Sequence, residues 1–303
     1  MSNHLVWIPA PQINLLGDLP ADIEVAPMPS EPLSDPRIGE VEFVVPPFGA
    51  DFSAIFPAMT ALKVVHAPGT GVDAIIDSVP SHVTLCSARG TNHTAVAEWT
   101  VAAILAGLRH FAFFRDEQNA GRWTRKSPTQ IAESTILFVG YGAIAQRVEE
   151  LLTPFGPTVL RVARRARPGV ETFAELPDLL PVADVVAILL PLTKETDGTV
   201  DATFLSQMKE GALLVNPSRG RIVDTDALIA ALESGRITAV LDVTDPEPLP
   251  AGHPLFFAPG IFITPHTAGV TKNGPRATYR LITEQLHHLS AGEEFRNVVQ
   301  DGY

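Results

Sequence analysis

The stretch Ser134–Arg167, STILFVGYGAIAQRVEELLTPFGPTVLRVARRAR, decides the fold of this chain. Thr135–Val139 is a short apolar run rich in β-branched and aromatic residues, which is typical of a buried strand. Ala143–Leu152 follows with apolar residues at helical spacing, and Thr158–Ala163 is a second apolar run. The stretch therefore predicts a βαβ unit of about thirty residues.

The glycines between the first strand and the helix indicate a dinucleotide site. Gly140 can make the tight turn, and Gly142 lets the backbone approach a pyrophosphate closely. Ala145 is the third small residue, where helix packs against strand. The helix N-terminus offers unpaired N–H groups and the positive end of its dipole to phosphates. An ordinary turn between strand and helix is the alternative.

The end of the second strand indicates the cofactor. A carboxylate about twenty residues past the glycines normally holds the ribose hydroxyls of NAD. Here Ala163 occupies that place, and the guanidiniums of Arg164, Arg165 and Arg167 follow. They could bind a 2′-phosphate, which favours NADP(H) and leaves NAD(H) possible. A solvated basic loop is the alternative.

The bulk properties narrow the class of protein. The chain has 303 residues, 46% of them hydrophobic, which is enough for two domains with cores of their own. A net charge of −12 argues against nucleic acid or an anionic membrane as a partner. The single cysteine, Cys86, fits a reducing compartment. No signal peptide or long apolar run is recognisable, so we expect a soluble cytoplasmic protein.

Before the βαβ unit, the chain predicts a smaller α/β unit and a buried helix. Prolines from Pro9 to Pro47 leave little room for helix in the first part. Thr91–Phe114 is apolar nearly all round and predicts one long helix, buried in its own core or by a second subunit. In the latter case Trp99, Phe111, Phe113 and Phe114 could anchor the interface. The strands expected in the first unit are Leu5–Ile8, Val41–Val45, Leu62–His66 and Val83–Ser87.

After the βαβ unit, strands and helices continue to alternate, which predicts a doubly wound parallel sheet. The expected strands are Val185–Leu190, Ala212–Val215, Thr238–Leu241 and Ile261–Thr264, and the expected helices are Asp201–Lys209, Thr225–Glu233 and Asn273–Ser290.

Residues capable of chemistry follow several of these strands. Arg219, Glu247 and His266 lie after three successive strands, where open α/β sheets bind ligands. Arginine can grip a carboxylate and polarise a neighbouring keto group, and histidine can donate the proton that a new alkoxide needs. A nearby glutamate orients the histidine. Taken singly, each residue could be structural. The nine histidines show no metal-binding spacing, so we expect no metal.

One loop of the first unit could bind a small anion. Gly69, Thr70 and Gly71 follow a strand and could present backbone N–H groups. A plain turn is equally consistent with the composition.

Taken together, these motifs resemble the D-isomer-specific 2-hydroxyacid dehydrogenases, which include glyoxylate/hydroxypyruvate reductases, glycerate dehydrogenases and phosphoglycerate dehydrogenases. The resemblance runs from about Gly69 to His266. Its motifs are GTGVD (69–73), HTAVAE (93–98), VGYGAIA (139–145), LPLTKET (190–196), VNPSRGRIVD (215–224), LDVTDPEPLP (241–250) and PHTAG (265–269).

The resemblance implies a role for each matching residue. Arg219 would bind and polarise the substrate, His266 would be the acid/base and Glu247 its partner, while Gly69, Thr70 and Gly71 would meet the substrate carboxylate. Asp242 would hold the nicotinamide carboxamide. The other implied cofactor contacts are Thr94, Gly140, Tyr141, Gly142, Ala143, Ile144, Arg164, Arg165, Leu190, Pro191, Leu192, Thr193, Thr196, Pro217, Ser218, Arg219 and His266.

The family also implies the architecture and the activity. We expect a Rossmann domain at 93–284 and a smaller flavodoxin-like substrate domain from 1–92 and 285–303, in a homodimer formed through the helix matching Thr94–Phe114. The expected reaction is hydride transfer between a nicotinamide cofactor and a small 2-oxo or (R)-2-hydroxy acid such as glyoxylate or hydroxypyruvate. Activity on phosphoglycerate or phosphite, and a non-catalytic dinucleotide-sensing protein, are the alternatives.

Overall fold

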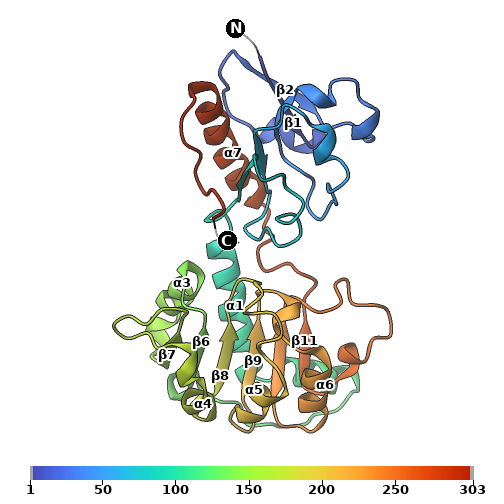
Figure 1. Cartoon of the computed structure of the whole chain (residues 1–303). Helices are drawn as coiled ribbons and strands as arrows, with labels where there is room; N and C mark the ends of the chain where they lie inside the picture. Colours follow the sequence, from blue (N-terminus) through green and yellow to red (C-terminus); the bar gives the residue numbers. More distant parts are fainter. Residues whose placement is uncertain (1–2, 301–303) are drawn as a thin grey trace. The chain divides into compact units, whose positions relative to one another are not determined.

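The computed structural model describes residues 3–300, which form two compact units. Residues up to 92 and from 271 onward form the first unit, and residues 93–270 form the second. Figure 1 shows that each unit is built around its own sheet. The chain returns to the first unit at residue 271 rather than at the expected 285. The reason is helix α7 (Gly274–Ala291), which packs on the first unit's sheet through Tyr279 and Ile282 as well as through Leu286.

The second unit contains the predicted doubly wound sheet. All its strands are parallel, in the order β11-β10-β9-β8-β6-β7. The strand order reverses beside β6, which has β7 on one side and β8 on the other, so the ligand-binding crevice of such sheets falls at the carboxyl end of β6. The strands are β6 (Thr135–Val139), β7 (Thr158–Val162), β8 (Val185–Ile188), β9 (Leu213–Asn216), β10 (Thr238–Leu241) and β11 (Ile261–Ile263).

Helices cover both faces of this sheet. One face packs on α1 (His93–Leu108) and α3 (Ala143–Leu152), with Ile104 and Val148 fully buried. The other face packs on α4 (Leu176–Leu179), α5 (Ala202–Gln207) and α6 (Thr225–Glu233). Because both faces are covered, the strands read as continuous apolar runs, which made them recognisable.

The single helix expected at Thr91–Phe114 is wrong. Arg109 and His110 interrupt the apolar run, and His110 adopts a left-handed backbone with φ of 56°. The chain therefore forms α1 and then α2 (Phe111–Asn119), bent by 62°. Among residues 3–300 no single helix is long and apolar enough to cross a membrane, although this bent pair passes by length and composition alone.

The first unit has a five-stranded parallel sheet in the flavodoxin-like order β2-β1-β3-β4-β5. Four strands lie where the sequence predicts them. The strand β2 (Ile23–Pro27) was missed, because it is a partly buried edge strand that ends in proline and has no continuous apolar run. The others are β1 (His4–Ile8), β3 (Val41–Val44), β4 (Val64–His66) and β5 (Thr84–Cys86).

Short 3-10 helices replace α-helices in the proline-rich part, as the prolines suggest. They are η1 (Ala10–Leu15), η2 (Pro32–Ser34), η3 (Ile38–Glu40) and η4 (Phe56–Ala58), and later ones are η5 (Ile131–Glu133), η6 (Thr153–Phe155), η7 (Phe173–Glu175), η8 (Leu180–Val182), η9 (Gly220–Ile222) and η10 (Pro254–Phe257).

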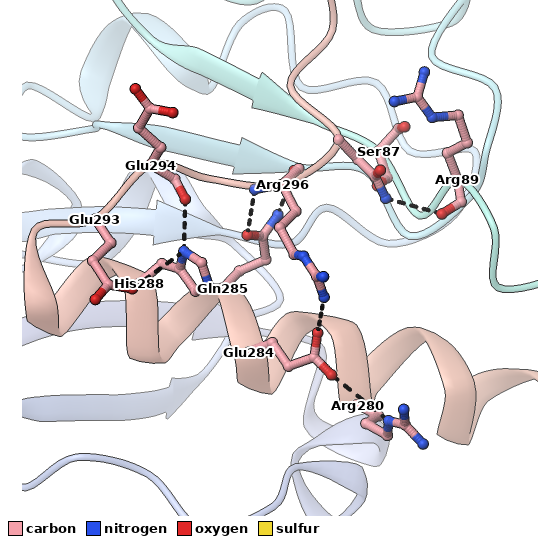
Figure 2. A network of polar contacts seen from close by, with 10 residues as sticks. Ser87, Arg89, Arg280, Glu284, Gln285, His288, Glu293, Glu294 and Arg296 are labelled. Atoms are coloured by element: carbon pink, nitrogen blue, oxygen red, sulfur yellow. Dashed lines mark hydrogen bonds and ion pairs between the residues drawn. The ribbon is translucent and has the colours of Figure 1, made fainter.

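Hydrogen bonds made by Gln285 and Asn297, together called the polar latch, hold the segment after α7 against the first unit's sheet (Figure 2). The buried amide of Gln285 donates to the carbonyl of Arg296 at 2.7 Å and accepts from its N–H at 3.0 Å. The next residue, Asn297, donates from its side chain to the Arg89 carbonyl at 2.9 Å and accepts from the Ser87 N–H at 3.1 Å. The latch therefore connects α7 to the segment that follows β5.

One buried histidine makes the first unit sensitive to acid. His66 is fully buried at the end of β4, where its ring stacks on Phe43. Its Nδ1 contacts the Ala67 carbonyl at 3.0 Å, and its Nε2 has no hydrogen-bond partner among the described residues. Burial lowers the pKa of His66 to about 4. The folded state therefore favours the neutral ring, and the unfolded chain takes up its proton near pH 6.5.

We predict that this stabilisation is lost as the pH falls from about 6.5 to about 4, by about 3 kcal/mol. Urea unfolding of wild type and His66→Leu from pH 7.5 to 4 measures it, since the difference between them isolates the histidine. The exposed His82→Leu is the matched control and should leave the pH dependence unchanged. Parallel pH profiles for wild type and His66→Leu would contradict the prediction.

Candidate active site

The glycine loop after β6 has the shape and the hydrogen-bond donors of an anion site. Gly140 has φ of 99°, and a Cβ there would overlap the Leu189 carbonyl, so only glycine fits. A Cβ on Gly142 would meet no atom, which leaves open space in front of the loop. The backbone N–H groups of residues 141–144 donate to no described protein group. Four free donors at the N-terminus of α3 fit a pyrophosphate.

The three arginines after β7 differ in whether they contact other protein groups. Arg167 donates to the Tyr141 carbonyl at 2.5 Å and lies 5.5 Å from the centre of its ring, so it braces the glycine loop. Arg164 and Arg165 are exposed, and neither has a hydrogen-bond or ion-pair partner among residues 3–300. These two are therefore the arginines available to a ligand. Ala163 is partly exposed, and its N–H donates to the Glu171 carbonyl at 2.9 Å.

The charge of Arg164 acts on a glutamate in the loop after β8. A hydrogen bond with Thr193 is the largest cause that lowers the pKa of Glu195, and the charges of Arg164 and Lys194 add to it. Since β6 separates β7 from β8, Arg164 acts across the end of β6, where the glycine loop lies.

The loop after β8 closes on itself beside the glycine loop. The Leu190 side chain is buried and lies against the position where Gly140 lacks a side chain. The Thr196 hydroxyl donates to the Pro191 carbonyl at 2.6 Å and accepts from the Thr193 N–H at 2.8 Å. Thr196 therefore shapes this loop.

A buried asparagine organises the loop after β9, and sequence reasoning missed it. The Asn216 side chain donates to the Arg219 carbonyl at 3.0 Å and accepts from the Ser218 N–H at 3.0 Å. The Ser218 hydroxyl donates to the Ile188 carbonyl of β8 at 2.5 Å. A polar residue that ends a buried strand was the available signal for Asn216.

Gly220 follows Arg219 for a steric reason. A Cβ on Gly220 would overlap the Thr244 carbonyl, so the loops after β9 and β10 touch at this point. The Arg219 guanidinium donates to the Ser218 carbonyl at 2.7 Å. This bond ties the side chain to its own loop.

His266 and Glu247 contact each other at the carboxyl edge of the sheet. The His266 Nδ1 lies 2.5 Å from the Glu247 Oε1, and about one third of each side chain is exposed, 33% and 38%. His266 has φ of 53°, an uncommon conformation for a residue other than glycine. Because Glu247 contacts Nδ1, Nε2 is the nitrogen that could exchange a proton with a substrate.

Asp242 holds the loop that carries His266. Its carboxylate is buried and accepts from the Thr264 hydroxyl at 2.5 Å and from the N–H groups of Thr267 and Ala268 at 2.8 Å each. Its carbonyl accepts from the His266 N–H at 2.7 Å. Asp242 is thus a structural residue of the loop, while the expected contact with a carboxamide stays a prediction. Sequence reasoning missed Thr264 and Thr267, because their partner lies on another strand.

The loop Gly69–Gly71 lies in the first unit, after β4. Its three N–H groups donate to no described protein group, and the Gly69 carbonyl accepts from the Ala88 N–H at 2.9 Å. The Thr70 hydroxyl donates to the Asn92 side chain at 2.8 Å. The loop is therefore held in place with its donors available. The remaining expected contacts are Thr94, exposed in the first turn of α1, Ala143 and Ile144 in the first turn of α3, and Pro217 between Asn216 and Ser218.

Residues 101–268 match the family model for the D-isomer specific 2-hydroxyacid dehydrogenase NAD binding domain. The chain belongs to this family. The dehydrogenase is an oxidoreductase that uses a nicotinamide cofactor and acts on small 2-hydroxy acids. It is 35% identical over 260 residues to glyoxylate/hydroxypyruvate reductase A of Klebsiella pneumoniae strain 342, covering 80% of this chain and 82% of that protein.

Solved structures resemble the dehydrogenase over its whole length. A D-isomer specific 2-hydroxyacid dehydrogenase from Xanthobacter autotrophicus Py2, in complex with NADPH and MES, has a TM-score of 0.85 and 31% identity, with 100% of each chain covered. An NADPH-dependent glyoxylate/hydroxypyruvate reductase from Sinorhizobium meliloti, in complex with NADP and sulfate, has a TM-score of 0.83 and 26% identity, again with 100% covered.

We predict that Asp242→Asn lowers kcat of the dehydrogenase about ten- to a hundredfold. The amide would point a donor at the Thr267 and Ala268 N–H groups, and a displacement of about 1 Å at His266 is enough for such a loss. Steady-state kinetics in which the cofactor and the 2-oxo acid are varied in turn measure the change in kcat. The exposed Asp245→Asn is the control. A change confined to the KM of the cofactor would instead show that Asp242 only holds the carboxamide.

Proposed function

We propose that the dehydrogenase reduces small 2-oxo acids, glyoxylate and hydroxypyruvate foremost, with NADPH as its preferred cofactor, and oxidises (R)-2-hydroxy acids in reverse. The observation that carries the proposal is the 2.5 Å contact between His266 and Glu247 beside the Arg219 loop. A non-catalytic binding protein would have no need of an oriented acid/base pair. The names of the Klebsiella and Sinorhizobium proteins support the choice of substrate.

The proposed chemistry divides between four protein groups. The Arg219 guanidinium binds the substrate carboxylate and polarises the keto oxygen, and the N–H groups of Gly69–Gly71 bind the carboxylate as well. Reduced nicotinamide, when bound, supplies the hydride to the keto carbon. His266 donates a proton from Nε2 to the developing alkoxide, and Glu247 keeps the ring oriented and stabilises its charged form.

The residues around the glycine loop fit a dinucleotide phosphate. We propose that the free N–H groups of residues 141–144 hold the pyrophosphate and that Arg164 and Arg165 bind the 2′-phosphate. Leu190 lies beside the loop, and Leu190 and Pro191 would line the cofactor. Ala163 has no carboxylate that could repel a 2′-phosphate or accept from ribose hydroxyls.

A panel of 2-oxo acids, assayed with NADPH and NADH in parallel, tests this function. Reduction of glyoxylate or hydroxypyruvate supports it. Cofactor binding without turnover of any acid would instead indicate a dinucleotide-sensing protein, and reduction of NADP with phosphite would indicate a phosphite dehydrogenase.

We predict that His266→Ala lowers kcat by roughly 10²–10⁴-fold while cofactor affinity changes little, because the alanine enzyme lacks the proton donor. Steady-state kinetics and a fluorescence titration with NADPH measure the two effects. The exposed His82→Ala is the control. A His266→Ala enzyme with more than half of the wild-type kcat would exclude the histidine from the mechanism.

We predict that the wild-type enzyme prefers NADPH by roughly ten- to a hundredfold in kcat/KM, the effect of one charge-assisted hydrogen bond, toward the low end because the arginines are exposed. Ala163→Asp combined with Arg164→Ala should shift the preference toward NADH. Measuring kcat/KM for both cofactors at two salt concentrations checks it, because an exposed charge pair weakens with salt. A preference for NADH that does not change with salt would show that Arg164 and Arg165 belong to a solvated loop and do not bind the cofactor.

The homodimer stays a prediction, and the surface of the second unit is compatible with it. Trp123 is 95% exposed and Phe111 is 62% exposed. Trp99, by contrast, donates from its indole to the Thr264 hydroxyl at 3.1 Å and belongs to the core of its own unit.

A further inference from the structure

The side chain of Tyr141 belongs to a polar network that the proposed chemistry leaves without a role. Its hydroxyl donates to the Glu149 Oε2 at 2.6 Å. The same carboxylate accepts two hydrogen bonds from the Arg161 guanidinium, one of them at 2.8 Å from Nε. The guanidinium also lies 5.5 Å from the centre of the Tyr141 ring. Residues of α3 and β7 therefore hold this phenol, while its backbone is part of the glycine loop.

The protonation states in this network favour a fixed ring. The hydrogen bond from Arg161 is the largest cause that lowers the pKa of Glu149, so the carboxylate stays ionised. Burial is the largest cause that raises the pKa of Tyr141, so the phenol keeps the proton that it donates. Hydrogen bonds to an ionised acceptor are stronger than those between neutral groups. The ring of Phe138 stacks on that of Tyr141 at 6.4 Å and restricts it further.

The arginine loop, residues 163–171, starts and ends on β7. Arg167 and Val170 exchange two backbone hydrogen bonds, at 3.1 and 2.8 Å, and so close a tight turn. The Glu171 N–H then donates to the Arg161 carbonyl of β7 at 2.8 Å. Because the loop is bonded to the strand that it leaves, the backbone that carries its arginines is held in place.

The side chain of Arg167 connects the arginine loop to the glycine loop. Its guanidinium donates to the Tyr141 carbonyl at 2.5 Å and lies 5.5 Å from the centre of the Tyr141 ring. A cation over an aromatic ring is attracted by the ring's negative face, and a hydrogen bond from a charged donor is a strong one. Tyr141 is therefore the residue at which the two loops meet.

We propose that Tyr141 is a positioning residue for the dinucleotide, and that it holds the glycine loop and the arginine loop at one separation. The inference rests on the proposed function, which places the pyrophosphate at the first loop and the 2′-phosphate at the second. A ligand that bonds to both loops binds more tightly when their separation is set in advance. NADPH and NADH share the pyrophosphate. Tyr141 and Arg167 therefore support the binding of both cofactors, whereas Arg164 supports that of NADPH alone.

Fluorescence titrations with NADPH and with NADH test this role through the two dissociation constants. Tyr141→Phe keeps the ring and should raise both constants roughly threefold to tenfold, and Tyr141→Leu should raise both by a larger factor. Arg167→Gln should also raise both, and Arg167→Lys should restore part of the affinity. Arg164→Gln should weaken the binding of NADPH alone. Arg147→Gln is the matched control, because Arg147 lies on α3 and pairs with Glu150 on its surface.

Steady-state kinetics separate positioning from general damage to the fold. In Tyr141→Phe the KM of each cofactor should rise, while kcat and the KM of glyoxylate should stay within about twofold of wild type, because only ground-state binding of the cofactor is weakened. An Arg167→Gln enzyme that loses affinity for NADPH and keeps that for NADH would overturn the proposal, since Arg167 would then bind the 2′-phosphate itself. Unchanged affinity for both cofactors in Tyr141→Leu would overturn it too.

Hydrogen–deuterium exchange of the cofactor-free protein tests the same contacts without any ligand. The Gly140 N–H donates to the Val162 carbonyl at 2.9 Å, and the Gln146 N–H donates to the Gly142 carbonyl at 3.0 Å. Both amides should exchange faster in Tyr141→Leu than in wild type, because the glycine loop opens more often. If the wild-type protein binds neither cofactor, the proposed function fails on its own. The exchange then decides the role of Tyr141, since faster exchange supports it and equal exchange refutes it.

Discussion

Parallel pairing of the strands is the constraint on which the rest of this structure depends. In a parallel sheet every strand delivers its carboxyl end to the same edge, so residues far apart in the sequence are brought together there. The glycine loop, the arginine loop, Arg219, Asp242 and His266 all follow strands of the second unit's sheet. The candidate site is a consequence of this geometry.

The loops at that edge would be mobile without buried polar groups to hold them. The buried side chain of Asn216 ties the Arg219 loop, and that of Asp242 ties the His266 loop, each with several hydrogen bonds. Such bonds are costly to leave unmade in the interior, so they restrict each loop to one conformation. In the first unit, side-chain hydrogen bonds of Gln285 and Asn297 likewise hold the segment beside the Gly69–Gly71 loop.

Sequence reasoning succeeded where local pattern and tertiary environment agree. The buried strands are continuous apolar runs because helices cover both faces of the sheet, and the glycine spacing has meaning because strand and helix flank it. It failed where the environment overrides the pattern. The strand β2 is only half buried, and the kink at His110 depends on one residue's backbone. The domain crossing at 271 depends on which sheet α7 packs against, which its amphipathic pattern alone does not reveal.

The sequence by itself determined the fold class, and it singled out the glycine loop, the arginines after β7 and Arg219, Glu247 and His266 as candidates, because each follows from residue type and its distance from a strand. Only the tertiary structure decided what those residues touch. It separated Arg167, which braces Tyr141, from Arg164 and Arg165, and it made Asp242 the support of the His266 loop. It also brought Glu149 and Arg161 to the Tyr141 side chain. The physical reason is that hydrogen bonds between loops join residues from different strands, and no spacing along the chain encodes those distances.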